Sequence, residues 1–261
     1  MAVALLPVSA EAATGAWVRF SASDEASSRE VSHVAWDALL ERYVVAGDAG
    51  IHLFRYGEVS REDRRALEKY LDELSAVAPS KLTRARQLPF WINLYNALTI
   101  RVVLDHYPVD SIRDIRPTWL QRGPWKKAWL SVDGEPITLD DIEHRILRPI
   151  WRDPRIHYAV NCASLGCPNL QRVAFTEANA EELLESAARA FVNHPRAASI
   201  EDGDLIVSSI YHWFREDFGD SERGVLDHLR RYAEPRLAGR LRGIQEIHDH
   251  RYDWSLNDAG R

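Results

Sequence analysis

Both cysteines of the chain lie in one short segment that also carries other side chains able to take part in catalysis. Residues 156–170 read IHYAVNCASLGCPNL, and Cys162 and Cys167 are the only cysteines among the 261 residues. Three further polar side chains lie beside them: His157, Asn161 and Ser164. Thiols, imidazoles and hydroxyls are the groups on which nucleophilic catalysis depends. We therefore take this segment as the first candidate for an active site.

The pattern of residues 156–161 predicts a half-buried strand that ends at Cys162. Large apolar residues alternate there with smaller or polar ones, and Gly166 and Pro168 then favour a tight turn. An extended chain would place His157 about 16 Å from Cys162, at roughly 3.3 Å per residue. The imidazole of His157 then reaches a sulfur only if the turn folds the thiols back.

A second group of candidates lies on the helix that we expect over residues 139–148. Its apolar stripe consists of Leu139, Ile142, Ile146 and Leu147. Glu143 falls near the centre of that stripe, and His144 lies about 100° around the helix from it. A carboxylate on an apolar face is costly unless it has a partner. That partner is either an arginine, such as Arg148 or Arg101, or a histidine or thiol of the candidate site.

The first interpretation is a thiol-dependent hydrolase or acyltransferase that acts on a peptide-like or amide bond. Such an enzyme needs a thiolate, a histidine that shares its proton, an orienting acid and oxyanion donors. Cys162 is the favoured nucleophile because loop amides and Asn161 can supply those donors, while Cys167 remains the alternative. His157 and His144 are both open as the base, and the carboxylate described above is the orienting acid.

Two other interpretations use the same residues. In the first, Cys162 and Cys167 form a disulfide that pins a loop of a non-enzymatic binding domain. In the second, both cysteines and a histidine hold a metal ion. The Cys-x4-Cys spacing is at the long end of the structural-zinc range, and no second ligand pair of similar spacing accompanies it. We rank the metal site last and expect neither a metal nor a cofactor.

Composition limits the partners that this chain can have. Its 33 basic and 39 acidic residues give a net charge of −6, which argues against the basic face of a nucleic-acid-binding protein. No stretch approaches the roughly 18 consecutive apolar residues that a membrane span needs. We therefore expect a small peptide-like substrate or a protein as the partner, with no nucleic acid and no membrane span.

The first 30 residues read as a tail ahead of the domain. The start is apolar, and small residues follow at 9, 10, 12 and 13, as at the end of a secretory signal peptide. The positively charged segment that opens such a peptide is missing. We predict residues 1–30 to be a tail that contains the remnant of a signal peptide. Export to the periplasm or the exterior is slightly favoured over the cytoplasm.

A buried helix is predicted over residues 90–105, restarted at Pro89 after an earlier segment. The helix is apolar nearly all round, yet Asn93 and Asn96 fall together on one inward side. Each buried amide needs a partner, because leaving it unpaired costs roughly 1–3 kcal/mol. The two amides either brace backbone groups or support the candidate site. On the second reading the substrate-binding set is Asn161, Ser164, Asn93 and Asn96.

The remaining periodicities predict roughly nine helices and six short strands, many of them in hairpins. One hairpin is expected around Asp133-Gly134 and another around Asp202-Gly203. Such a mixture favours the α+β class over a wound parallel sheet. We predict a single compact domain over residues 31–258, mostly helical, with a small antiparallel or mixed sheet built from hairpins.

Four segments together resemble the family called domain of unknown function 547. They are FWINLYNAL at 90–98, LDDIEHRILR at 139–148, HYAVNCASLGCP at 157–168 and YDWSLN at 252–257. The resemblance covers about residues 31–258, and the family it points to occurs in bacterial proteins, often exported, and at the C-terminus of plant proteins. It also suggests distant kinship with papain-like and transglutaminase-like cysteine hydrolases. That kinship implies functional roles for Glu143, His144, His157, Asn161, Cys162 and Cys167.

Overall fold

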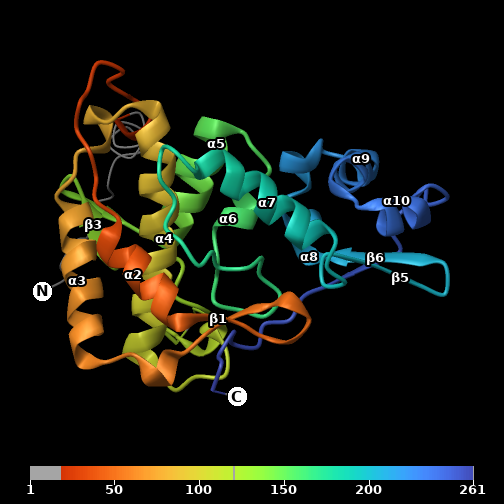
Figure 1. Ribbon diagram of the computed structural model, residues 1–261, viewed down its shortest axis with the longest axis horizontal. Helices are drawn as coiled ribbons and strands as arrows, with labels where there is room; N and C mark the ends of the chain where they lie inside the picture. Colours follow the sequence, from red (N-terminus) through yellow and green to blue (C-terminus); the bar gives the residue numbers. More distant parts are fainter. Residues whose placement is uncertain (1–18, 120, 261) are drawn as a thin grey trace, which may run out of the picture.

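A long buried helix, α4 (Arg84–His106), is the central element of the molecule, and α2 and α3 lie beside it (Figure 1). The computed structural model describes residues 19–119 and 121–260. Thr83 caps α4 by accepting a hydrogen bond from the backbone N–H of Arg86. The prediction that Pro89 restarts the helix is wrong, because Pro89 lies inside it. A proline this close to the start removes one backbone hydrogen bond, and burial of the apolar residues that follow outweighs that loss.

Helices α2 (Val34–Tyr43) and α3 (Arg61–Ser75) complete the first hydrophobic cluster. Ser60 caps α3 by accepting a hydrogen bond from the backbone N–H of Asp63, as the capping-box pattern indicates. The inward face of α3 is fully apolar: Leu67, Tyr70, Leu71 and Leu74. Helix packing thus surrounds α4 with apolar side chains, as its sequence requires.

A second hydrophobic cluster lies beyond α7 (Ala180–Val192), on the right of Figure 1. It contains α9 (Glu222–Tyr232), α10 (Pro235–Leu241) and one three-stranded sheet. Its strands are β5 (Ala198–Glu201), β6 (Asp204–Ser208) and β7 (Asp249–Arg251). β5 and β6 form an antiparallel hairpin, and β7 adds to β6 in parallel. This sheet is therefore mixed.

Two further hairpins complete the strands in the described part of the chain. β1 (Val44–Ala46) pairs with β2 (His52–Phe54), and β3 (Leu130–Val132) pairs with β4 (Glu135–Ile137). The remaining short helices are η1 (Asp48–Gly50), η2 (Tyr56–Glu58), η3 (Pro79–Lys81), η4 (Ile112–Asp114), η5 (Asp141–Leu147), α5 (Arg148–Trp151), α6 (Ile156–Ala159), α8 (Ser209–Trp213) and η6 (Arg215–Phe218). The predicted α+β class, with one compact, mostly helical domain and small sheets from hairpins, is confirmed.

The C-terminal segment returns from the second cluster to the first. After β7 it forms an antiparallel bridge between Leu256 and Ser164, and then a parallel bridge between Asp258 and Phe54. Ser164 belongs to the loop that carries both cysteines. The last residues of the chain therefore hold that loop against β2.

Part of the segment predicted as a tail packs on the domain. Phe20 is buried in the first cluster, with its ring 5.3 Å from that of Trp91. The features that suggested a signal peptide lie within residues 1–18, outside the described residues, so export stays a prediction. Among the helices of residues 19–119 and 121–260, none has the length and apolar character to cross a membrane.

Candidate functional site

The segment before the cysteines is helical, so the prediction of a strand over residues 156–161 is wrong. Ile156 to Ala159 form α6, and the chain becomes extended only at Val160. Asp153 starts this turn by accepting hydrogen bonds from the backbone N–H groups of Arg155 and Ile156. All four residues of α6 are buried, because they lie between the two hydrophobic clusters. Because every side of this segment is buried, apolar and polar residues do not divide between an inward and an outward face. The pattern of apolar residues therefore does not distinguish a helix from a strand here.

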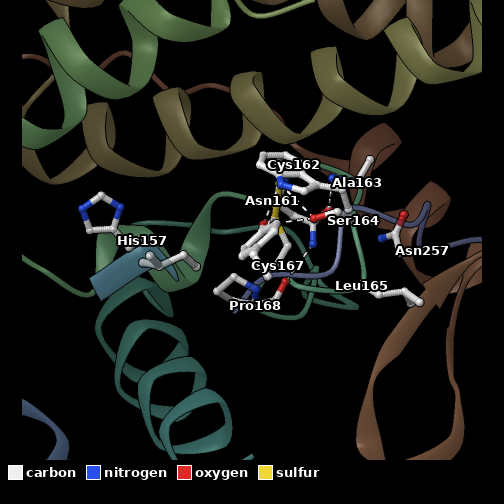
Figure 2. Close-up of a disulfide and its surroundings, with 12 residues drawn as sticks. His157, Asn161, Cys162, Ala163, Ser164, Leu165, Cys167, Pro168 and Asn257 are labelled. Carbon is white, nitrogen blue, oxygen red and sulfur yellow. Dashed lines mark hydrogen bonds between the residues drawn. A yellow bond between two sulfur atoms is a disulfide. The ribbon is translucent and has the colours of Figure 1, made fainter. Parts of the chain in front are cut away.

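The next segment, residues 162–167, is a loop closed by a disulfide between Cys162 and Cys167 (Figure 2). We call it the cysteine loop. Asn161 braces it from within: its side-chain N–H donates to the carbonyl of Pro168 (2.7 Å), and its side-chain oxygen accepts from the N–H of Ala163 (2.8 Å). The amide of Asn161 therefore bonds to the backbone on both sides of the disulfide.

Helix α4 holds the same segment through one of its two inward amides. The Asn96 side chain donates to the carbonyl of Ala159 (2.9 Å) and accepts from the N–H of Asn161 (2.8 Å). Asn93 makes the equivalent pair of bonds to the backbone of Phe175, at 2.7 and 3.0 Å. Both asparagines are buried, so the prediction that they face inward is confirmed. Their amides brace backbone groups.

Tyr252, from the C-terminal segment, contacts both sulfur atoms. Its hydroxyl donates to the Cys167 sulfur (3.1 Å), lies 3.1 Å from the Cys162 sulfur, and accepts from the Ser164 hydroxyl (3.0 Å). Burial raises the pKa of Tyr252 above its usual range, so the group is a neutral hydroxyl and a hydrogen-bond donor. Gly166 permits this close approach, since a Cβ there would lie 2.8 Å from the backbone of Asp253.

A row of acidic and imidazole groups lies beside the loop. The Nε2–H of His157 donates to Asp217 at 2.6 Å, and its Nδ1 lies 3.7 Å from a carboxylate oxygen of Glu143. The Tyr95 hydroxyl donates to the other oxygen of Glu143 at 3.1 Å. The His157 ring is buried and stacks on Phe214, with centroids 4.4 Å apart. Both nitrogens of His157 thus face carboxylates.

Asp217 is the anchor of this row. Burial raises the pKa of its carboxyl, but hydrogen bonds from His157 and Arg148 outweigh that effect and lower the pKa to about 2. Arg148 also pairs with Glu216. The alternative in which an arginine neutralises Glu143 is therefore not observed, since Arg148 binds Asp217 and Arg101 binds Asp105.

The cysteine loop, Glu143 and His157 contribute to one pocket of about 160 Å³, whereas Asp217 and Arg148 lie outside its lining. The predicted site residues on its walls are Glu143, His144, His157, Cys162 and Cys167. Six aromatic residues share them: Tyr95, Trp125, Trp213, Phe214, Tyr252 and Trp254. We call this the aromatic pocket. His144 is less enclosed than His157, with 35% of its side chain exposed, and lies 3.9 Å from Asp140.

Sequence reasoning missed the partners that come from distant parts of the chain. Asp217 lies 60 residues from His157, and no local pattern marks it. Tyr252 and Trp254 belong to the YDWSLN segment. This segment contributed to the family resemblance, but its sequence did not indicate what its residues do. Within residues 19–119 and 121–260, no cluster of three or more His, Cys, Asp and Glu side chains is arranged to hold a metal ion.

The fold and the pocket define a mostly helical α+β protein with an aromatic pocket beside a disulfide-closed loop. Residues 79–192 match the model of the family described as "Protein of unknown function, DUF547". The resemblance stated from the motifs is thereby confirmed over these residues. The match includes α4, α6, the cysteine loop and α7, while Asp217 and Tyr252 lie beyond it. No curated protein and no solved structure gave a match.

Proposed function

We propose that the aromatic pocket is a ligand-binding site, and that the Cys162–Cys167 disulfide acts as a staple that fixes one wall of it. The observation that carries this proposal is the position of the disulfide: Cys162 and Cys167 both line the pocket, and their sulfur atoms are joined to each other. A bonded sulfur is not a nucleophile, since the reactive form of cysteine is the thiolate. In this state the loop contributes shape and hydrogen bonding.

The surroundings of the disulfide support a binding role. The loop is held by the Asn161 side chain, by Tyr252, and by Arg196, whose guanidinium donates to the carbonyl of Leu165 at 2.8 Å. Fixing a loop before a ligand arrives lowers the entropy that binding has to offset. A pocket with a rigid loop on one side and aromatic rings on the other is typical of small-ligand sites.

A thiol-dependent hydrolase or acyltransferase is the second candidate, favoured by one observation. The two cysteines share their pocket with Glu143 and His157, and Asp217 orients the imidazole of His157. A dithiol reductant would convert the disulfide into two thiols and itself become a disulfide. The Cys162 thiolate would then add to an amide carbonyl, the amine would leave with a proton, and water would hydrolyse the thioester. Cys162 is the more exposed of the two cysteine residues.

The two candidates differ in what reduction does. The purified protein is treated with iodoacetamide before and after a dithiol, and the adducts are counted by intact mass. The binding role predicts no adduct before reduction and no turnover of amide, ester or thioester substrates after it. The hydrolase predicts turnover that appears only after reduction, is lost in Cys162→Ser, and persists in the matched variant Cys167→Ser. Such turnover would overturn the binding role.

A further inference from the structure

The walls of the aromatic pocket combine ring faces with negative charge. Four of its rings form a connected group: Trp125 packs on Trp254 (5.7 Å between centroids), and Trp213 packs on both Trp254 (5.6 Å) and Tyr252 (4.9 Å). Trp213 is 44% exposed, so this wall is open to solvent. Large aromatic side chains that stay open at the surface of a pocket are available to an incoming group.

Two carboxylates lie on the same walls, and no lysine or arginine is among the described residues that line the pocket. Glu143 is buried and bonded to Tyr95, whereas the Asp140 side chain is 29% exposed and has His144 at 3.9 Å. The nearby ammonium of Lys126 also attracts Asp140, but Lys126 lines a neighbouring pocket. The charged side chains that line the aromatic pocket are therefore acidic, apart from the two imidazoles. The guanidinium groups of Arg113 and Arg148 lie over the rings of Trp254 and Phe214, at 5.0 and 4.9 Å from the centroids, but neither arginine lines the pocket.

We infer that the aromatic pocket binds an alkylammonium group, such as an alkylated amine or the cationic end of a peptide-like ligand. Both the aromatic rings and the carboxylates favour binding of a cation. Aromatic faces attract positive charge, and carboxylates attract it more strongly. A neutral apolar group would gain from the rings alone, and an anion would be repelled by both. The pocket volume of about 160 Å³ is below the roughly 300–1,000 Å³ of sites for drug-sized ligands, so it suits a single head group.

This inference rests on the proposed binding function and names the class of its ligand. It is tested on the disulfide-intact protein, where no thiol chemistry takes place. The probes are choline and 3,3-dimethylbutan-1-ol, which share a shape and differ in charge. Tryptophan fluorescence or calorimetry gives the two dissociation constants. We expect choline to bind at least about tenfold more tightly than the neutral alcohol.

Variants locate the binding site. Trp213→Leu and Asp140→Asn should each weaken choline binding several-fold, and Asp140→Asn should leave binding of the alcohol unchanged. Trp119→Leu is the matched control, because Trp119 is 85% exposed and does not line the pocket. Circular dichroism verifies that each variant is folded.

Three results would overturn the inference: equal affinity for the two probes, absence of choline binding to the folded protein, or choline binding that Trp213→Leu does not alter. If only the neutral alcohol bound, the pocket would still be a ligand-binding site, but its proposed preference for a cation would be refuted. Turnover after reduction would remove the binding role as the principal function, whereas the choline preference of the oxidised protein would still stand.

Discussion

The Asn96 amide links the central helix to the candidate site, and its loss gives the sharpest test of how the site is positioned. In Asn96→Ala the carbonyl of Ala159 and the N–H of Asn161 both lose their partner, at present 2.9 and 2.8 Å away. An unpaired buried polar group costs about 1–3 kcal/mol, so the free energy of unfolding should fall by roughly 2–6 kcal/mol. Urea unfolding followed by circular dichroism measures this loss.

Asn93→Ala is the matched control, because Asn93 makes the same pair of bonds from the same helix to Phe175. We expect it to destabilise the protein by a similar amount. Only Asn96→Ala should accelerate hydrogen exchange in the cysteine loop, since only Asn96 contacts the segment that leads into it. A loss below about 1 kcal/mol in Asn96→Ala would refute the reasoning. Equal loosening of the loop in both variants would refute it as well.

Three further predictions concern stability. Replacing Cys162 and Cys167 by serine should lower the free energy of unfolding by about 2 kcal/mol, the chain-entropy value for so short a loop, and an unchanged urea midpoint would contradict this. Burial lowers the pKa values of His33 and His228 from 6.5 to about 4, so the unfolded chain binds more protons between these values. Unfolding free energy should fall as pH drops from about 6.5 to 4, by at most about 3 kcal/mol per histidine, and a flat profile of urea midpoints would count against it. Gly166→Ala should cost about 1–3 kcal/mol, because its Cβ would lie 2.8 Å from the Asp253 backbone, and calorimetry showing no loss would exclude that clash.

Local patterns were sufficient where an element is defined by its own neighbours. Ser60 and Asp63 fix the start of α3, and the spacing of its apolar residues fixes the face that it buries. The turns at Asp133 and Asp202 fix two hairpins, since positive φ values of 51° occur at both and each is followed by a glycine. Each of these signals acts within a few residues, so tertiary contacts did not override them.

The same reasoning failed at α6, where tertiary contacts decide the conformation. Tyr158 belongs to the second hydrophobic cluster, whereas Ile156 and Ala159 belong to the first. A four-residue segment packed between two clusters is buried on all sides. A helical turn and a strand then show the same pattern of apolar residues, so the sequence cannot distinguish them. The large side chains at alternate positions, Ile156, Tyr158 and Val160, are also what a half-buried strand would show.

For Glu143, the sequence predicts burial but does not identify the partner of the carboxylate. Its place on an apolar stripe predicted burial and the need for a partner, and Glu143 is buried. The identity of the partner depended on how η5 meets α6 and Tyr95 in space. Tyr95 lies on a helix and His157 in a segment that the sequence identifies, but the spacing of these residues does not predict that either one contacts Glu143.

Asn161 connects the two candidate functions through the geometry of the cysteine loop. The sequence predicts that the Asn161 amide donates to an oxyanion or a substrate, yet both ends of that amide bond to the backbone that flanks the sulfurs. The Cys162 N–H also donates to the Cys167 sulfur at 2.9 Å. Because the two Asn161 hydrogen bonds involve neither sulfur, we expect reduction to leave the two thiols near each other at the pocket wall. The disulfide would then reinforce a wall that hydrogen bonds also hold, and any reactivity that reduction releases would arise in a site that is already largely formed.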